Sequence, residues 1–342
     1  MSMQGKIRVL VVDDSIVFRE TLARAIGQDP AIEVVATAAD PYMARDKILE
    51  LEPDVMTLDV EMPRMSGIEF LKRLMPQYPI PVIVVSAVNE TVFDALNAGA
   101  VDFVSKPDAR SGRGLDSLVS ELIVKIKVAS MAKVIPVSGV TGAKPALAGA
   151  GPRQPGHMIA IGASTGGTEA IDTVLRGFSA DMPGTVIVQH MPPVFTAMYA
   201  NRLNNTCTVQ VREARTGDLI LPGRVLIAPG DHHMRVKRLN SNYMVECFRG
   251  DKVNGHCPSV DVLFNSVAHS VGEAAIGVIL TGMGNDGANG LLALRKAGAR
   301  TIGQDERSSV VYGMPKAAFA IGAVQEQVPL HLISRKIFSL LQ

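Results

Sequence analysis

Three residues that could together activate a hydroxyl group stand far apart in this sequence: Ser164, His190 and Asp286. A serine becomes a strong nucleophile when a histidine removes its proton and a carboxylate orients that histidine. Each of the three follows a short apolar run of the kind that forms a buried strand. Because the carboxyl ends of parallel strands share one edge of a sheet, we expect the three side chains to meet in one crevice.

The serine lies in a Gly-x-Ser-x-Gly segment formed by Gly162, Ser164 and Gly166. This spacing is typical of a sharp strand-to-helix turn that exposes the hydroxyl, and N–H groups at the helix start can face a developing oxyanion. The order serine, histidine, aspartate along the chain differs from the order in α/β-hydrolases. A triad here would therefore belong to a different sheet.

Taken singly, these residues have structural alternatives. Ser164 fits a helix N-cap, and residues 162–167 fit a phosphate-binding loop. His190 fits a core histidine, and Asp286 fits a turn beside a glycine. The hydrolytic interpretation depends on finding all three residue types at strand ends.

A second set of polar residues follows the apolar runs of the N-terminal part. Asp13 and Asp14 follow the first run, Asp59 the third, Ser86 the fourth and Lys106 the fifth. Three carboxylates within ~5 Å repel by a few kcal/mol per pair at an effective dielectric near 20. Hard oxygen ligands of this kind suit Mg²⁺, so the set predicts a Mg²⁺ site.

At such a site Asp59 could accept a phosphoryl group, with Lys106 stabilising charge and Ser86 bonding the phosphoryl oxygens. The structural alternative is that Asp13 and Asp14 cap a helix and that Lys106 is a surface charge.

The elements that must position both sets are strands alternating with helices. In the N-terminal part the expected strands are Ile7–Val12, Glu33–Ala38, Val55–Leu58, Val82–Val85 and Asp102–Val104, and the expected helices include Ile16–Ile26, Met43–Leu51 and Leu115–Ala129. A second alternation begins at Met158, includes the runs Thr185–Gln189 and Ala275–Leu280, and ends in a helix at Leu332–Leu341. We expect an α/β protein with two doubly wound parallel-sheet domains.

Between the two alternations, residues 130–156 are rich in Pro, Gly and Ala and have little to bury. This composition is typical of a semi-flexible linker. The expected domains are therefore residues 1–129 and 157–342, in agreement with a 342-residue chain.

Composition excludes several classes of protein. Lys and Arg number 34 against 33 Asp and Glu, which leaves no basic surplus for nucleic acid. No apolar run approaches the ~20 residues that span a bilayer, and no signal-peptide pattern precedes the first strand. Cys207, Cys247 and Cys257 form no Cys-x-x-Cys pair, which favours free thiols. We expect a cytoplasmic monomer without membrane insertion.

The first domain resembles a two-component receiver domain over residues 6–127. The motifs that carry the resemblance are Val11-Val-Asp-Asp-Ser15, Leu58-Asp-Val-Glu-Met-Pro63 with Ser66-Gly67, and Phe103-Val-Ser-Lys-Pro107. The resemblance implies a flavodoxin-like fold in which a histidine kinase phosphorylates Asp59, and Ser86, Phe103 and Lys106 form the switch. The candidate Mg²⁺ ligands are Asp13, Asp14, Asp59 and Glu61.

The second domain resembles the chemotaxis protein-glutamate methylesterase family, with a Rossmann-like α/β fold. The matching segments are Gly162-Ala-Ser-Thr-Gly-Gly167, Gln189-His-Met-Pro192 with Phe195-Thr196, Pro229-Gly-Asp231, Pro258-Ser-Val-Asp-Val-Leu-Phe264, Thr281-Gly-Met-Gly-Asn-Asp-Gly287 and Val310-Val-Tyr-Gly-Met-Pro315. One departure is Cys257, where the family favours arginine, and this affects the expected receptor preference.

This resemblance implies hydrolysis of glutamate γ-methyl esters on the cytoplasmic helices of methyl-accepting chemoreceptors, with release of methanol, and deamidation of glutamines there, which gives adaptation in chemotaxis. Ser164 would be the nucleophile, His190 the base and then the acid, and Asp286 its orienter. The backbone N–H groups of Thr165 and Met283 would form the oxyanion hole. The esterase reaction would need no cofactor.

Two other functions stay open from the residues alone. A receiver could control a non-catalytic module that binds a nucleotide or phosphate at residues 162–167, although that loop lacks the Gly-x-Gly-x-x-Gly spacing. A receiver could also control a DNA-binding output, which would require a basic helix-turn-helix that we do not find in the sequence.

Overall fold

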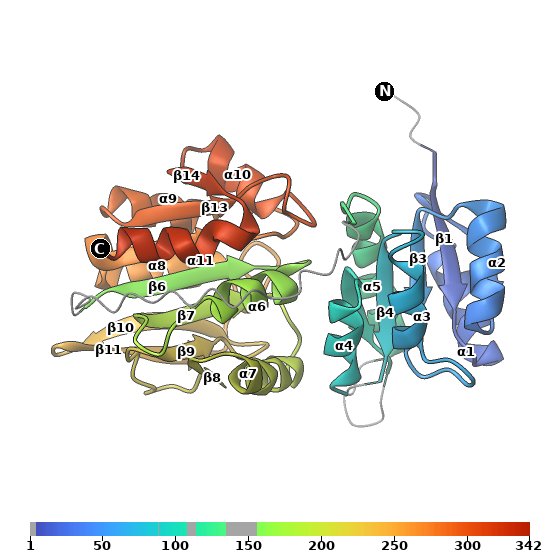
Figure 1. Ribbon diagram of the computed structural model, residues 1–342, viewed down its shortest axis with the longest axis horizontal. Coiled ribbons are helices and arrows are strands. Elements are labelled where there is room, and N and C mark those ends of the chain that lie inside the picture. The colour runs from blue at the N-terminus through green and yellow to red at the C-terminus, as the bar shows by residue number, and fades with distance from the viewer. Residues whose placement is uncertain (1–4, 88, 108–113, 135–155) are drawn as a thin grey trace. The chain divides into compact units, whose positions relative to one another are not determined.

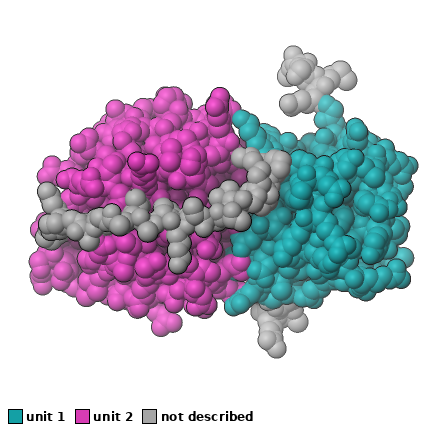
Figure 2. Space-filling view, in the orientation of Figure 1, with its two compact units in different colours: residues 1–141 teal, residues 142–342 magenta. Residues whose placement is uncertain are grey.

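The computed structural model describes residues 5–87, 89–107, 114–134 and 156–342. The chain divides into two units, Met1–Thr141 and Gly142–Gln342, which are coloured separately in Figure 2. Residues 135–155, most of the expected linker, lie outside the described residues. In the part of the chain that the structure describes, no helix is long and apolar enough to cross a membrane.

The first unit contains a five-stranded parallel sheet in the order β2-β1-β3-β4-β5. Its strands are β1 (Ile7–Val12), β2 (Ile32–Ala38), β3 (Val55–Leu58), β4 (Val82–Ser86) and β5 (Asp102–Ser105). Each expected strand is confirmed to within one residue at either end. The central strands β3 and β4 are buried throughout, and burial on both faces explains their apolar sequence.

Four helices connect these strands, and a fifth follows the last strand. They are α1 (Ile16–Ile26), α2 (Pro41–Leu51), α3 (Gly67–Leu74), α4 (Thr91–Asn97) and α5 (Leu115–Ala129). The second helix begins two residues before the expected Met43, because Asp40 is the N-cap and accepts hydrogen bonds from the backbone of Tyr42 and Met43. Pro41 then occupies the first helical position, where its fixed φ is favourable.

In this sheet β1 connects outward to β2, whereas β3 connects in the opposite direction to β4. The loops that follow β1 and β3 therefore diverge and leave a crevice at the carboxyl edge. Asp13 and Asp14 follow β1, and Asp59 follows β3, so the fold brings these carboxylates to that crevice.

The second unit contains a seven-stranded parallel sheet in the order β14-β13-β12-β6-β7-β9-β8. Its strands are β6 (Met158–Ala163), β7 (Gly184–Gln189), β8 (Gln210–Glu213), β9 (Arg224–Ile227), β12 (Ala275–Ile279), β13 (Arg300–Gln304) and β14 (Glu326–Val328). The two parallel sheets confirm the expected α/β class. An antiparallel hairpin, β10 (His233–Leu239) with β11 (Asn242–Phe248), was not expected from the sequence.

The helices of this unit are α6 (Gly167–Arg176), α7 (Phe195–Thr206), α8 (Val260–Ser270), a 3₁₀ turn η1 (Gly272–Ala274), α9 (Ala288–Lys296), α10 (Met314–Ala320) and α11 (Leu330–Leu340). Helices lie on both faces of the sheet (Figure 1). Alternate residues of β6, Met158 and Ala160, join one buried apolar cluster with Leu263 and Phe264 of α8 and Leu291 of α9. This packing fixes α8 against the sheet.

The direction of the connections reverses at the centre of this sheet. The chain passes from β6 to β7 on one side and from β12 to β13 on the other. The loops after β6 and β12 therefore leave in opposite directions and open a crevice between them. Ser164 follows β6, and the loop that contains Asp286 follows β12.

Candidate active site

A buried hydrogen bond joins two of the residues expected to act together. The Nε2 atom of His190 lies 2.9 Å from Oδ2 of Asp286, and the two side chains are 7% and 1% exposed. A ring nitrogen that faces a carboxylate must carry a proton, so Nδ1 of the neutral ring keeps its lone pair. Nδ1 is buried and has no hydrogen-bond partner among the described residues. The histidine therefore has one nitrogen held and one available.

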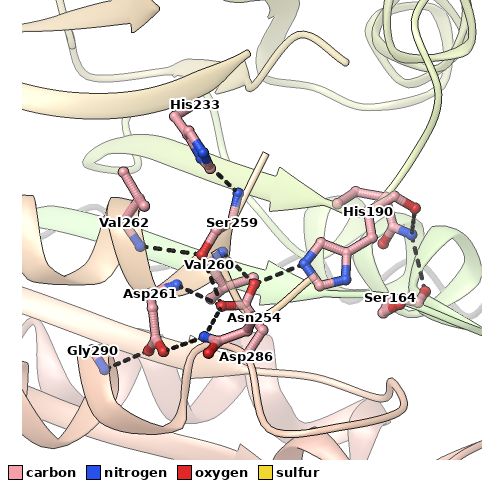
Figure 3. A network of polar contacts seen from close by, with 11 residues as sticks. Ser164, His190, His233, Asn254, Ser259, Val260, Asp261, Val262, Asp286 and Gly290 are labelled. Atoms are coloured by element: carbon pink, nitrogen blue, oxygen red, sulfur yellow. Dashed lines mark hydrogen bonds and ion pairs between the residues drawn. The ribbon is translucent and has the colours of Figure 1, made fainter. Parts of the chain in front are cut away.

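Ser164 lies beside this histidine because β6 and β7 are neighbours. Ala163 and Gln189 are paired across the two strands, and the next residues are Ser164 and His190. The His190 backbone N–H donates to the Ala163 carbonyl over 3.1 Å, and Nε2 of Gln189 donates to the Ser164 carbonyl over 2.9 Å. Figure 3 shows Ser164 on the side of the His190 ring opposite Asp286. The structure thus brings the three expected residues together, with His190 between Ser164 and Asp286.

Two glycines allow the loops around Ser164 to approach closely. Gly166 has a φ of 75°, which places it in the left-handed region before α6. A Cβ atom at Gly282 would lie 2.7 Å from Cβ of Ser164, so a larger residue there would displace the serine. The Ser164 N–H donates to the Thr281 carbonyl over 3.0 Å, and this bond ties the loop after β12 to the serine.

The two expected oxyanion donors lie on these tied loops. Thr165 directly follows the serine, and its carbonyl accepts a hydrogen bond from Oγ1 of Thr281 over 3.0 Å. Met283 directly follows Gly282 and is 40% exposed. Thr165 is therefore next to Ser164 in the sequence, and Met283 is next to Gly282, which packs against Ser164.

The carboxylate of Asp286, which belongs to the loop between β12 and α9, reaches the N-terminus of α8. The carboxylate accepts hydrogen bonds from the backbone N–H of Val260 over 2.7 Å and of Asp261 over 3.2 Å. Oγ of Ser259 and Nδ2 of Asn254 donate to it over 2.8 Å and 2.9 Å. Free N–H groups at a helix start favour a negative charge, so the sheet and α8 together hold this carboxylate (Figure 3).

The ionisation of Asp286 follows from these contacts. Burial would raise its pKa, but the hydrogen bond from His190, with the bonds from Asn254 and Val260, holds the pKa well below its usual range. Asp286 is therefore an anion at neutral pH. An anion beside Nε2 stabilises the histidine when Nδ1 takes up a proton.

A second serine and histidine, Ser259 and His233, also belong to this network. Nε2 of His233 faces the carbonyl of Asp251 over 2.9 Å and must donate to it, while Nδ1 accepts the backbone N–H of Ser259 over 3.2 Å. Neither ring nitrogen is left to accept the proton of the Ser259 hydroxyl, which points to Asp286 instead. Ser259 is also fully buried. We conclude that this pair supports Asp286 and does not supply a nucleophile.

The network contains two residues to which the sequence interpretation gave no role, Asn254 and Ser259. Ser259 accepts a hydrogen bond from the Val262 N–H as the N-cap of α8, which a serine before an apolar helix could have indicated. Asn254-Gly255 is a turn dipeptide, but nothing in the sequence tells which carboxylate the asparagine reaches.

In the first unit, three carboxylates gather at the crevice between β1 and β3. Ligand atoms of Asp13, Asp14 and Asp59 all lie within 4.8 Å of one another. The Nζ atom of Lys106 lies 2.8 Å from Oδ2 of Asp13 and 2.6 Å from Oδ2 of Asp59. Burial raises the pKa of Asp59, although the hydrogen bond from Lys106 opposes this. The oxygen-only donor set and the close carboxylates are typical of a Mg²⁺ site.

The other expected residues of this unit lie around the cluster. Oγ of Ser86 is buried without a hydrogen-bond partner among the described residues. Phe103 is buried, and its ring contacts that of Phe93 edge-on, with centroids 6.5 Å apart. Glu61 stands outside the carboxylate cluster, and its side chain accepts a hydrogen bond from Asn89 over 2.8 Å.

The two sheets and their sites indicate a class of protein: a hydrolase joined to a phosphoacceptor domain. Comparisons with known proteins agree with this class. Residues 9–112 match the family described as response regulator receiver domain, and residues 159–337 match the family described as CheB methylesterase. The chain belongs to the CheB methylesterase family. The family indicated by the sequence motifs is thereby confirmed, as is methylesterase activity under the control of a receiver domain.

Individual relatives match over the full length. A protein-glutamate methylesterase/protein-glutamine glutaminase 2 of Syntrophomonas wolfei is 63% identical over 336 residues, 98% of each chain. A protein of the same name, without the number, from Syntrophotalea carbinolica is 54% identical over 352 residues, 99% of each chain. The crystal structure of the Thermotoga maritima CheB methylesterase catalytic domain covers 55% of this chain and 100% of its own, with 37% identity and a TM-score of 0.53.

Proposed function

We propose that this enzyme hydrolyses γ-methyl esters of glutamate side chains on chemoreceptors, releasing methanol, and deamidates glutamines on the same receptors. The observation that carries this proposal is the buried Asp286–His190 pair, in which Nδ1 of His190 has no hydrogen-bond partner among the described residues and lies on the side of Ser164. The names of the full-length relatives supply the substrate class, a protein glutamate or glutamine side chain.

The proposed reaction begins with attack of the Ser164 hydroxyl on the ester carbonyl while Nδ1 of His190 takes its proton. Asp286 holds the Nε2 proton and stabilises the imidazolium. The backbone N–H groups of Thr165 and Met283 bind the oxyanion of the tetrahedral intermediate. His190 then gives its proton to the leaving methoxide, so methanol departs and an acyl-serine forms.

The second half repeats the chemistry with water. His190 removes a proton from water, the hydroxide attacks the acyl-serine, and the proton returns to the Ser164 oxygen. The products are a glutamate side chain and the free enzyme. With a glutamine substrate the leaving group is ammonia, and the same acyl-enzyme follows.

In the receiver domain, we assign Asp59 as the residue phosphorylated by a histidine kinase. Asp13, Asp14 and Asp59, with Glu61 as a further candidate, would hold Mg²⁺, which when bound neutralises charge on the transferring phosphoryl group. Lys106 already contacts two of these carboxylates. The Ser86 hydroxyl, which has no hydrogen-bond partner in the part of the chain that the structure describes, would bond a phosphoryl oxygen, and Phe103 would complete the switch.

The remaining parts of the proposal concern organisation. We assign residues 1–129 to the receiver, 130–156 to a linker and 157–342 to the esterase domain. The cytoplasm is the proposed location, because the receptor helices that carry the glutamates lie there. Three free cysteines are compatible with a reducing compartment. We propose that the protein acts as a monomer.

A serine-directed fluorophosphonate should label Ser164. The reagent reports a hydroxyl activated by a neighbouring base, since phosphonylation follows the first step of the proposed reaction. Peptide mass spectrometry of the labelled full-length chain should find the adduct on Ser164 and none on Ser259. His190→Ala should slow labelling at least about 100-fold, because the base is lost. Equal labelling of other serines would contradict the assignment of the nucleophile.

A fragment that starts at Gly156 should hydrolyse receptor esters faster than the unphosphorylated full-length chain, by about 5- to 100-fold. We propose that the unphosphorylated receiver restrains the esterase domain and that phosphorylation relieves the restraint. The crystallised Thermotoga maritima relative is a catalytic domain alone, so such a fragment is a reasonable protein to prepare.

Acetyl phosphate should stimulate the full-length chain in this comparison and leave the fragment unchanged. Methanol release from methylated receptor membranes measures both effects. Equal rates for the fragment and the unphosphorylated parent would contradict restraint, and would indicate that the phosphorylated receiver activates the enzyme directly.

A further inference from the structure

A short turn between β11 and α8 reaches the His190–Asp286 pair. Val253 and His256 exchange two backbone hydrogen bonds of 3.0 Å. Between them Asn254 and Gly255 both have positive φ, 52° and 83°, which is the conformation of a two-residue type I′ hairpin turn. This conformation fixes the directions of the side chains on the turn.

Two residues of the turn contact the candidate active site. Nδ2 of Asn254 donates to Asp286 over 2.9 Å and to Asp261 over 2.7 Å. The ring of His256 stacks on that of His190, with centroids 3.7 Å apart and an angle of 8° between the planes. The turn therefore covers one face of the imidazole and also bonds the carboxylate that orients it.

We propose that His256 is a positioning residue, whose stacked ring holds the His190 imidazole in the plane that joins Ser164 to Asp286. The proposal rests on the function assigned to Ser164, His190 and Asp286 above. Among the described residues, the one side-chain hydrogen bond of His190 is to Asp286. That bond and the attachment to Cβ fix two points of the ring but leave the ring free to rotate about the line between them. A flat group 3.7 Å away on one face restricts this rotation.

The charge state of His256 is compatible with this role. Burial lowers its pKa to about 4, the neighbouring His190 and Lys252 lower it too, and Asp286 opposes them. His256 is therefore neutral at neutral pH. A neutral ring can remain stacked when His190 takes a proton from Ser164, whereas a cation at this position would repel the imidazolium.

His256 is not itself the base in this arrangement. Among the described contacts, the carboxylate of Asp286 bonds Nε2 of His190, and no hydrogen bond links it to the ring of His256. The contribution of His256 would be to orient His190. A misplacement of about 1 Å at a reacting group can cost on the order of 100-fold in rate. An imperfectly restrained ring should lower kcat and leave substrate binding nearly unchanged.

Three substitutions of His256 in the full-length chain separate stacking from other roles. His256→Ala removes the ring, His256→Phe keeps a flat ring without nitrogen atoms, and His256→Lys introduces a fixed positive charge. His269→Ala is the matched control, because this exposed histidine lies in the last turn of α8, at the end away from Asp286. Each chain is activated with acetyl phosphate, and methanol release from methylated receptor membranes gives kcat and KM as functions of pH.

We expect kcat to fall about tenfold in His256→Ala with KM within about twofold. His256→Phe should recover kcat to within about threefold of the parent, because it restores the stack. In His256→Lys kcat should fall further than in His256→Ala. The acidic limb of its kcat/KM profile should move to lower pH, since a nearby positive charge disfavours protonation of His190. His269→Ala should match the parent.

Other outcomes overturn the inference. If His256→Ala retains the parental kcat, orientation by stacking is excluded. If His256→Phe is as impaired as His256→Ala while thermal unfolding shows both to be folded, a ring nitrogen of His256 is needed and the stacking role is wrong. Ser164→Ala, measured in the same assay, distinguishes a failure of the proposed function from a failure of the role proposed for His256. Activity in that variant contradicts the proposed function, whereas its inactivity with normal His256 variants contradicts only this inference.

Discussion

Replacing Ser164 with alanine is expected to reduce methanol release from methylated receptors by about 10⁴- to 10⁶-fold, or about 5 to 8 kcal/mol of barrier. The substitution removes the only atom that can form the acyl-enzyme in the proposed reaction, while Asp286 and His190 keep their hydrogen bond. His190→Ala should cause a similar loss, because members of such a group act as a unit. The fold and the phosphorylation of Asp59 should be unaffected.

Ser259→Ala is the matched control for this prediction. It deletes a second serine hydroxyl of the same network, which donates to Asp286 over 2.8 Å and caps α8. The backbone N–H groups of Val260 and Asp261 and the amide of Asn254 remain on the carboxylate. We expect a loss of about tenfold, comparable with one hydrogen bond to a charged group. Methanol release from Ser164→Ala near the parental rate would exclude the assignment.

The second large effect is expected at Asp59. Asp59→Asn should abolish Mg²⁺-dependent labelling by acetyl phosphate, because an amide cannot supply the attacking carboxylate oxygen. Asp14→Ala should weaken labelling, since it removes one carboxylate of the cluster within 4.8 Å. Phosphate incorporation, measured by radiolabel or by a mobility shift on phosphate-affinity gels, reports both.

Asp46→Asn is the control for the receiver substitutions. Asp46 is exposed on α2 and pairs with Arg45, away from the carboxylate cluster. It should be labelled like the parent. Persistent label in Asp59→Asn would mean that another residue accepts the phosphoryl group.

The sequence predicted the frame of both domains well, for a physical reason. Strands covered on both faces need apolar residues at every position, so they are visible as short continuous runs. The runs at Ile7–Val12 and Val55–Leu58 coincide with β1 and β3. Residues directly after such strands lie at one edge of the sheet, so the convergence of Ser164, His190 and Asp286 could be predicted without knowledge of any contact.

The partners of Asp286 could not be predicted in the same way. Val260 and Asp261 contribute backbone N–H groups, which carry no sequence signal, and they reach the carboxylate because α8 packs on the sheet. Asn254 and His256 lie beyond the hairpin of β10 and β11, which interrupts the alternation of strand and helix. Their positions depend on tertiary packing between segments distant in the sequence.

The position of Asp286 at the start of α8 has a consequence for how this enzyme can evolve. The carboxylate that bonds His190, the proposed catalytic base, also accepts hydrogen bonds from the first-turn amides of a core helix. Replacement of Asp286 by an apolar residue would leave these buried amides without an acceptor, so descendants inactivated at this position would also be less stable. A descendant that keeps the fold but loses esterase activity would therefore more readily lose Ser164 than Asp286.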